Sequence, residues 1–171
     1  MDSAEATSLI HRYCNTADER AFNRFYREQA EKLWRFLVAR GCDRELAYDL
    51  VAEAFSRFIQ VVCRDPSSPK ALLYRIAINL HIDHLRRKKP AQDIDTLAEP
   101  AGEGPDLEQL VHTRQILSTL GESEQNLLLM RYWVGMTYRE IAEVLERPEG
   151  TIRRQSMELL RQLQARWGEE P

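Results

Sequence analysis

The chain has 171 residues, of which 43% are hydrophobic and 30% are charged, the composition of a soluble globular protein with one medium or two small domains. It contains no apolar run near the roughly 20 residues that span a bilayer, and its amino terminus lacks the basic start and apolar stretch of a signal peptide. We therefore expect a cytoplasmic protein with no membrane insertion. Three cysteines, Cys14, Cys42 and Cys63, are odd in number and lack C-x-x-C spacing. This pattern favours reduced, buried thiols over a disulfide framework or a zinc site.

Charge is distributed unevenly along the chain, whose net charge is -3. Residues 70–89 contain six basic residues and one acid, whereas residues 91–110 contain six acids and no Lys or Arg. The acidic stretch also holds two prolines and two glycines, which break helices and favour an extended chain. We predict a flexible acidic linker at residues 90–106 that holds apart two compact helical domains, at residues 1–89 and 107–171.

The first domain shows helical periodicity throughout. Apolar residues recur at three-and-four spacing over residues 22–37. A second apolar stripe covers residues 46–62 and follows Asp43, which can cap the helix. After a polar loop, Ser68 is the predicted N-cap of a third helix over residues 69–89. No alternating strand pattern is present, so the sequence predicts an all-α protein.

The second domain ends in a pattern typical of a helix-turn-helix. An apolar pattern over residues 107–117 is followed by a helix that Ser123 can cap. Residues 137–140 (TYRE) form a capping box, which begins a short helix. A turn at residues 147–150 then leads to a longer helix whose apolar positions lie within residues 152–163. The second helix of such a motif lies in the DNA major groove.

Three sequence blocks, in this order and split by a linker, resemble one family over nearly the whole chain. Residues 47–55 (AYDLVAEAF), residues 77–87 (AINLHIDHLRR) and residues 135–142 (GMTYREIA) with 148–153 (PEGTIR) carry the resemblance. They are similar to the polymerase-binding helix, the minus-ten promoter helix and the minus-thirty-five reader of the extracytoplasmic-function (ECF) sigma factors of bacterial RNA polymerase. The resemblance implies a transcription initiation factor that carries RNA polymerase to promoters and is not an enzyme.

The resemblance also implies which residues contact RNA polymerase core. The second helix of the family packs on the clamp of the largest polymerase subunit, and the second domain lies at the flap region. The matching residues here are Asp49, Leu50, Glu53 and Arg57. Without the family match, an ordinary solvated helix face is the better interpretation of these charges, and the resemblance reverses that preference.

Promoter opening is assigned by the resemblance to the third helix and the loop before it. The loop at residues 65–70 traps an extruded base, and the helix follows the separating strand. Clustered cations at the end of this helix suit phosphate contacts, although they also suit the negative end of the helix dipole. The predicted minus-ten residues are Lys70, Asn79, Asp83, Arg86, Arg87 and Lys88.

The last helix is the predicted minus-thirty-five reader. Placing the apolar positions inward leaves arginines outward, and arginine suits both guanine edges and phosphates. The predicted contacts are Thr151, Arg153, Arg154, Met157 and Arg161. The second domain departs from the family pattern at Glu146, Arg147, Gln155, Ser156 and Glu158, which makes it less cationic.

Other functions find less support in the sequence. Glycine-rich phosphate loops, nucleophile elbows and paired catalytic carboxylates are not apparent, so we expect neither an enzyme nor a cofactor. His81 and His84 are three residues apart, but we interpret them as structural or close to DNA rather than as metal ligands. The sequence leaves two alternatives: a sigma-like decoy that binds an anti-sigma factor without binding DNA, and an ordinary helix-turn-helix repressor. An anti-sigma partner is also expected if the chain is a working sigma factor.

Overall fold

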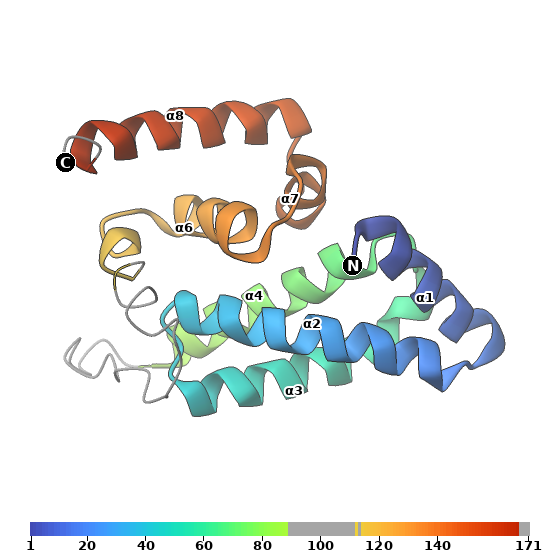
Figure 1. The fold of residues 1–171 in the computed structure, drawn as a ribbon. Helices are drawn as coiled ribbons and strands as arrows, with labels where there is room; N and C mark the ends of the chain where they lie inside the picture. Colours follow the sequence, from blue (N-terminus) through green and yellow to red (C-terminus); the bar gives the residue numbers. More distant parts are fainter. Residues whose placement is uncertain (89–111, 113, 168–171) are drawn as a thin grey trace.

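The computed structural model describes residues 1–88, 112 and 114–167, all of whose assigned elements are helical. The all-α prediction is confirmed, since these residues contain no strand. The predicted linker at residues 90–106 and Lys89 lie outside the described residues. Within the described ranges, none of the helices combines the length and apolar character needed to cross a bilayer. In chain order (Figure 1) the elements are α1 (Ser3–Thr16), α2 (Glu19–Ala39), α3 (Arg44–Val61), the 3-10 helix η1 (Val62–Arg64), α4 (Pro69–Arg87), α6 (Glu122–Leu128), the π-helix η3 (Leu129–Val134), α7 (Tyr138–Leu145) and α8 (Glu149–Trp167).

The amino lobe, residues 1–88, packs α1 to α4 around an aromatic core. The rings of Phe25 and Phe58 are fully buried and stack with their centroids 5.3 Å apart. Asp43 caps α3 as predicted, because its carboxylate accepts a hydrogen bond from a first-turn amide at 2.7 Å. Ser68 precedes α4 as predicted, although its hydroxyl caps none of the described amides. The two apolar stripes of the sequence therefore form one bundle core.

A disulfide joins α1 to η1, and the prediction of three reduced thiols is wrong for two of them. Cys14 and Cys63 are 49 residues apart in sequence, but packing brings their Cα atoms to 5.4 Å and their sulfurs are bonded. Helix α1, which the apolar pattern did not reveal, buries Leu9 and Ile10 against the other helices. Cys42 is free and buried as predicted, and burial raises the pKa of its thiol to about 12.

The carboxyl lobe, residue 112 and residues 114–167, contains the predicted helix-turn-helix in α7 and α8. The capping box is confirmed: the Thr137 hydroxyl accepts from the Glu140 amide at 3.1 Å, and the Glu140 carboxylate accepts from the Thr137 amide at 3.2 Å. Helix α7 ends at Leu145, and its C-cap Glu146 has a left-handed backbone with φ 55°. That conformation favours glycine, so the turn carries local strain.

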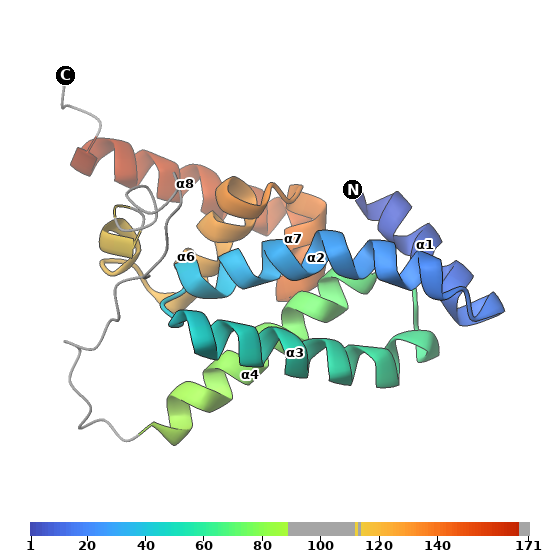
Figure 2. The same cartoon turned by 60° about the horizontal axis from the view of Figure 1, so that its bottom comes forward.

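The two lobes pack directly against each other, which contradicts the expectation that a linker holds them apart. Helix α7 lies against α4, and η3 lies against α2, as both views show (Figures 1 and 2). Their buried apolar residues form one continuous cluster. Each lobe covers apolar residues that the other would leave exposed to water. The lobes pack together because removing apolar surface from water is favourable.

Arg40, at the end of α2, links a buried histidine to the carboxyl lobe. Its Nε–H donates to Nδ1 of His81 at 3.0 Å, and its Nη2 lies 3.2 Å from the Glu122 carboxylate. Burial lowers the pKa of His81 to about 4, and the positive charge of Arg40 adds to the effect. His81 is therefore a structural histidine, as interpreted from the sequence, and the described residues contain no group of three or more side chains placed to hold a metal ion.

The disulfide predicts a stability that depends on redox state. Closing a loop of 49 residues restricts the unfolded chain, so reduction or Cys63→Ser lowers the free energy of unfolding by about 3–4 kcal/mol. Urea unfolding with and without dithiothreitol measures this difference. The reduced wild type and Cys63→Ser are matched controls, and we expect them to have the same urea midpoint. A wild-type midpoint that does not change when dithiothreitol is added contradicts the pairing of Cys14 with Cys63.

The buried His81 predicts a loss of stability in mild acid. Its ordinary pKa is 6.5 and its folded pKa is about 4, so the unfolded chain takes up a proton before the folded one does. The contribution of His81 to the free energy of unfolding is thus fully present above pH 6.5 and falls by up to about 3 kcal/mol as the pH drops towards 4. Urea midpoints measured across this range test it. His81→Gln still accepts from Arg40 but does not titrate, so an equally steep decline in that variant rules out the assignment.

Candidate nucleic-acid interface

The outer side of α3 presents the residues predicted to contact polymerase. Asp49, Glu53 and Arg57 are exposed, and Arg57 pairs with Glu53 at 2.8 Å across one helical turn. The structure separates Leu50 from this set, because its side chain is only 5% exposed and packs in the core. Tyr48 joins the exposed strip instead, with 59% of its surface open and its ring 5.4 Å from that of Trp34. The α3 strip is therefore acidic with an aromatic edge.

The far end of α4 presents most of the predicted minus-ten residues on its surface. We name the exposed set Asn79, Asp83, Arg86, Arg87 and Lys88 the α4 face. The first three are spaced by four and three residues, so they share one side of the helix. The three cations of the α4 face make no ion pair with any other described residue. No acid of the described residues therefore occupies these three cations.

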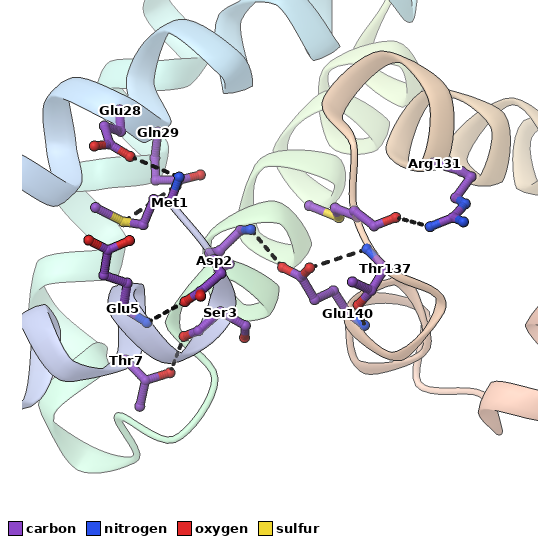
Figure 3. Close-up of polar contacts among 12 residues, drawn as sticks. Met1, Asp2, Ser3, Glu5, Thr7, Glu28, Gln29, Arg131, Thr137 and Glu140 are labelled. Atoms are coloured by element: carbon purple, nitrogen blue, oxygen red, sulfur yellow. Dashed lines mark hydrogen bonds and ion pairs between the residues drawn. The ribbon is translucent and has the colours of Figure 1, made fainter.

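Lys70 does not belong to the α4 face, which corrects its predicted role in this arrangement of the lobes. Its ammonium lies 2.6 Å from Oε2 of Glu140 on α7, and the two side chains are only 10% and 12% exposed. Figure 3 shows the Glu140 carboxylate also accepting from the amide of Thr137, through its other oxygen. The Lys70 ammonium keeps two further N–H donors, but burial of its side chain leaves little room for a phosphate to reach them in this arrangement.

The pKa of Glu140 reflects two opposing effects. Burial disfavours the charged carboxylate and raises its pKa, whereas the hydrogen bonds from Lys70 and Thr137 and the charge of Lys70 lower it. The net direction is downward, so Glu140 is ionised at neutral pH. The contact is a true ion pair rather than a hydrogen bond between neutral groups.

Further polar contacts cross the boundary between the lobes. Arg75 of α4 pairs with Glu146 at the end of α7, and Arg40 pairs with Glu122 at the start of α6. Arg114 donates in the opposite direction, from the carboxyl lobe to the backbone oxygen of Val38 at 2.8 Å. We name Lys70–Glu140, Arg75–Glu146 and Arg40–Glu122 the interlobe ion pairs. Sequence reasoning missed all three, because each joins residues at least 70 positions apart.

The outer side of α8 presents the predicted minus-thirty-five residues. Arg153, Arg154, Met157 and Arg161 are exposed and line one open hollow, whereas Thr151 is half-buried. Two of these arginines pair with acids on their own helix: Arg153 with Glu149 at 3.1 Å, and Arg161 with Glu158 at 2.8 Å. Exposed pairs of this kind contribute little to stability, so both arginines can exchange their partners.

Tyr138 of α7 sets the orientation of α8. The guanidinium of Arg131 lies 4.2 Å from its ring centroid, and that of Arg153 lies 5.3 Å from it. The Tyr138 hydroxyl is 3.3 Å from that of Ser156, which is fully buried. This hydrogen bond explains how a serine is accommodated on the apolar stripe of α8, since a buried hydroxyl requires a partner.

The chain matches two family models and several curated proteins. Residues 25–90 match Sigma-70 region 2, and residues 113–163 match Sigma-70 region 4. The chain is 31% identical to the RNA polymerase sigma-H factor of Pseudomonas aeruginosa over 158 residues, covering 80% of each chain. It is 29% identical to the ECF RNA polymerase sigma factor SigC of Mycobacterium tuberculosis, covering 87% of this chain and 84% of that one. The ECF RNA polymerase sigma-E factor of Escherichia coli K12 is also 29% identical, with 80% and 81% covered.

One solved structure shares the arrangement of helices over almost the whole chain. It is described as CnrH in complex with the cytosolic domain of CnrY, and it aligns with a TM-score of 0.74 at 19% identity. The alignment covers 98% of this chain and 99% of that one. The two family models and the identity to sigma-H show that the chain is an RNA polymerase sigma factor, and the relatives named ECF sigma factors agree that it belongs to the extracytoplasmic-function group.

Proposed function

We propose that this chain binds RNA polymerase core and directs it to specific promoters by opening the minus-ten element and binding the minus-thirty-five element. The observation that carries the proposal is a pair of exposed basic surfaces, one at the end of α4 and one along α8. They lie within the ranges that match Sigma-70 regions 2 and 4. Its partners are polymerase core and promoter DNA, so its proposed site of action is the cytoplasm.

The α4 face suits a separating DNA strand. Arg86, Arg87 and Lys88 are exposed cations at the end of the helix, where each phosphate contact releases close to one counterion. Asn79 and Asp83 add hydrogen-bonding groups on the same side for unpaired base edges. Opening the duplex costs about 1.4 kcal/mol of stacking for each base-pair step, so the chain acts together with polymerase rather than alone.

The exposed side of α8 suits duplex DNA. Arg154 lies beside Met157 and Arg161 on the helix surface, and its guanidinium is 3.5 Å from the Thr151 hydroxyl rather than in an ion pair with a described acid. A bidentate guanidinium can read guanine in the major groove, while Arg153 and Arg161 can reach phosphates. We propose Arg154 as the main base contact of the carboxyl lobe.

The α3 strip is the proposed contact with the clamp of the largest polymerase subunit. Asp49 and Glu53 present carboxylates, and the exposed Tyr48 ring adds apolar area beside them. A rim of charge around an aromatic residue is a common composition for protein interfaces. The carboxyl lobe is the proposed contact with the flap region.

A decoy that binds an anti-sigma factor without DNA is the second candidate. Its specific support is the pairing of Arg153 and Arg161 with acids of their own helix, which reduces the net cationic charge of α8. The solved structure with the same fold contains CnrH in complex with the cytosolic domain of CnrY. An anti-sigma factor is a proposed partner of this chain under either function. Binding to DNA and polymerase distinguishes the two.

Run-off transcription tests the main proposal. Purified chain is mixed with core polymerase and a library of genomic promoter fragments, and we expect discrete transcripts from a subset of promoters because the chain supplies promoter choice. Core polymerase alone is the control and gives none of these transcripts. If no promoter responds although the chain binds core polymerase, the decoy is favoured instead.

Arg154→Ala tests the minus-thirty-five role of α8. Loss of a bidentate base contact costs about 1–3 kcal/mol, so binding to a duplex that carries the selected minus-thirty-five element weakens roughly tenfold. Arg166→Ala removes the same charge from the exposed end of the same helix and is the matched control. Fluorescence anisotropy measures both variants, and equal losses in the two would contradict a specific role for Arg154.

A further inference from the structure

The disulfide between Cys14 and Cys63 is unusual chemistry for a chain whose proposed site of action is the cytoplasm. Small thiols keep most cysteines in that compartment reduced, and the disulfides that do form there are usually transient, catalytic or redox-sensing. A permanent structural cross-link is the typical role of disulfides in secreted proteins instead. The compartment of the proposed function therefore favours a reversible bond.

The two sulfurs of the bond differ in their access to solvent. Cys63 lies in η1 and is exposed, whereas Cys14 lies near the end of α1 and is half-buried against the core. An exposed disulfide exchanges more easily with small thiols than a buried one does. A small reactant can thus reach Cys63 from solvent, with Cys14 as the inner partner. Cys42 is buried, so its lower accessibility distinguishes it from the pair.

Apolar packing holds the two cysteines near each other independently of the bond. Leu9 and Ile10 anchor α1 in the core, and Val62, directly before Cys63, is fully buried. The Cα atoms of the two cysteines are 5.4 Å apart, within the range that a disulfide requires. These anchors remain when the bond is broken, so the two thiols stay close enough to pair again.

The segment that follows η1, residues 65–68, has few other contacts. We name it the α4 entry loop, because it leads into α4. The Asp65 carboxylate accepts from the Ser67 amide and hydroxyl, which are within the loop itself. Its contact with α1 is the Thr7 hydroxyl, which lies 3.5 Å from the Ser67 carbonyl oxygen, a long hydrogen bond. The Ser68 hydroxyl caps none of the described amides. The disulfide is therefore the strong link between α1 and the start of this loop.

We propose that Cys14 and Cys63 form a reversible redox site, oxidised by peroxide and reduced by small thiols, which orders the α4 entry loop when bonded and releases it when reduced. The loop sets the start of α4, and α1 packs on α4 as well. The consequence for transcription rests on the proposed function, because the far end of α4 carries the α4 face. The oxidised chain is the more ordered form and the more active one.

The oxidation is a balanced two-electron reaction. The Cys63 thiolate attacks hydrogen peroxide, so that an S–O bond forms, the O–O bond breaks and hydroxide leaves. The Cys14 thiolate then attacks the sulfur of the resulting sulfenic acid, forming the S–S bond and displacing a second hydroxide. The two protons that the thiols lost convert both hydroxides to water. Two thiols and one peroxide thus give one disulfide and two waters.

Reduction consumes two molecules of a small thiol. The first, as its thiolate, attacks the exposed sulfur of Cys63, and the electron pair of the broken S–S bond leaves on Cys14, which takes up a proton. The second attacks the small-molecule sulfur of the mixed disulfide and releases Cys63, which is protonated in turn. The oxidised product is the disulfide of the small thiol.

A redox titration tests reversibility on the full wild-type chain. The chain is incubated in mixtures of reduced and oxidised glutathione that span cytosolic ratios, then denatured and alkylated, and its free thiols are counted by mass spectrometry. We expect the count to rise from one, Cys42, to all three cysteines across the series. It returns to one when glutathione is removed and one equivalent of hydrogen peroxide is added. A count that stays constant across the series overturns the reversible site.

Hydrogen–deuterium exchange tests the release of the loop without any variant. Ordering the backbone of a single residue changes an equilibrium by roughly tenfold, so we expect exchange in the α4 entry loop to be about tenfold faster in the reduced chain. Helix α8, in the other lobe, is the internal reference and keeps its rates. Circular dichroism checks that the reduced chain stays helical. Unchanged exchange in the loop, or global unfolding on reduction, overturns the switch and leaves a structural cross-link.

Run-off transcription from a responsive promoter tests the functional consequence. We expect roughly tenfold less transcript from the reduced wild type than from the oxidised one, for the same entropic reason. Cys14→Ser behaves as the reduced chain does and does not respond to dithiothreitol, which shows that the reductant does not act on polymerase. Cys42→Ala is the matched control and keeps the wild-type response, because Cys42 is outside the pair. Loss of the response in Cys42→Ala contradicts the assignment to Cys14 and Cys63.

The outcomes separate this proposal from the proposed function. Equal transcription from the oxidised and reduced chains overturns redox control of initiation. Transcription from neither form, together with a reversible pair and faster loop exchange on reduction, supports the redox site and opposes the proposed function alone.

Discussion

The buried ion pair between Lys70 and Glu140 is the contact on which the arrangement of this molecule depends. Both side chains are removed from water, and a charge in that environment is tolerated only beside its opposite. The pair therefore sets the position of α7 on α4. Because Tyr138 and Ser156 connect α7 to α8, it also sets the direction in which α8 presents its arginines.

Glu140 links the local folding of the helix-turn-helix to the docking of the lobes. One carboxylate oxygen accepts from the Thr137 amide and completes the capping box, while the other accepts from Lys70. Glu140 accepts a hydrogen bond at the start of α7 whether or not the lobes are docked. Its side chain is therefore already ordered, and the second carboxylate oxygen can accept from Lys70 without a further loss of side-chain conformational entropy. The same residue thus serves the stability of α7 and the contact between lobes.

Docking covers one part of the basic surface and leaves the rest open. Lys70 is buried at the start of α4, whereas Asn79 and the cations at its end are exposed, as is Arg154 on α8. The basic surfaces that carry the proposed function are thus accessible in the compact molecule. Strong charge complementarity, with cations on one lobe and carboxylates on the other, makes the contact specific in a way that apolar burial alone does not.

The sequence by itself determined the all-α class, the helix periodicities, the Asp43 cap, the capping box and the outward side of α8. Each of these depends on residues within one or two helical turns, and such spacing is visible in the chain. Only the tertiary structure decided the Cys14–Cys63 disulfide, the Arg40–His81 hydrogen bond and the interlobe ion pairs. These join residues 41 or more positions apart. Which distant side chains meet depends on how whole helices pack, and no local spacing encodes that geometry.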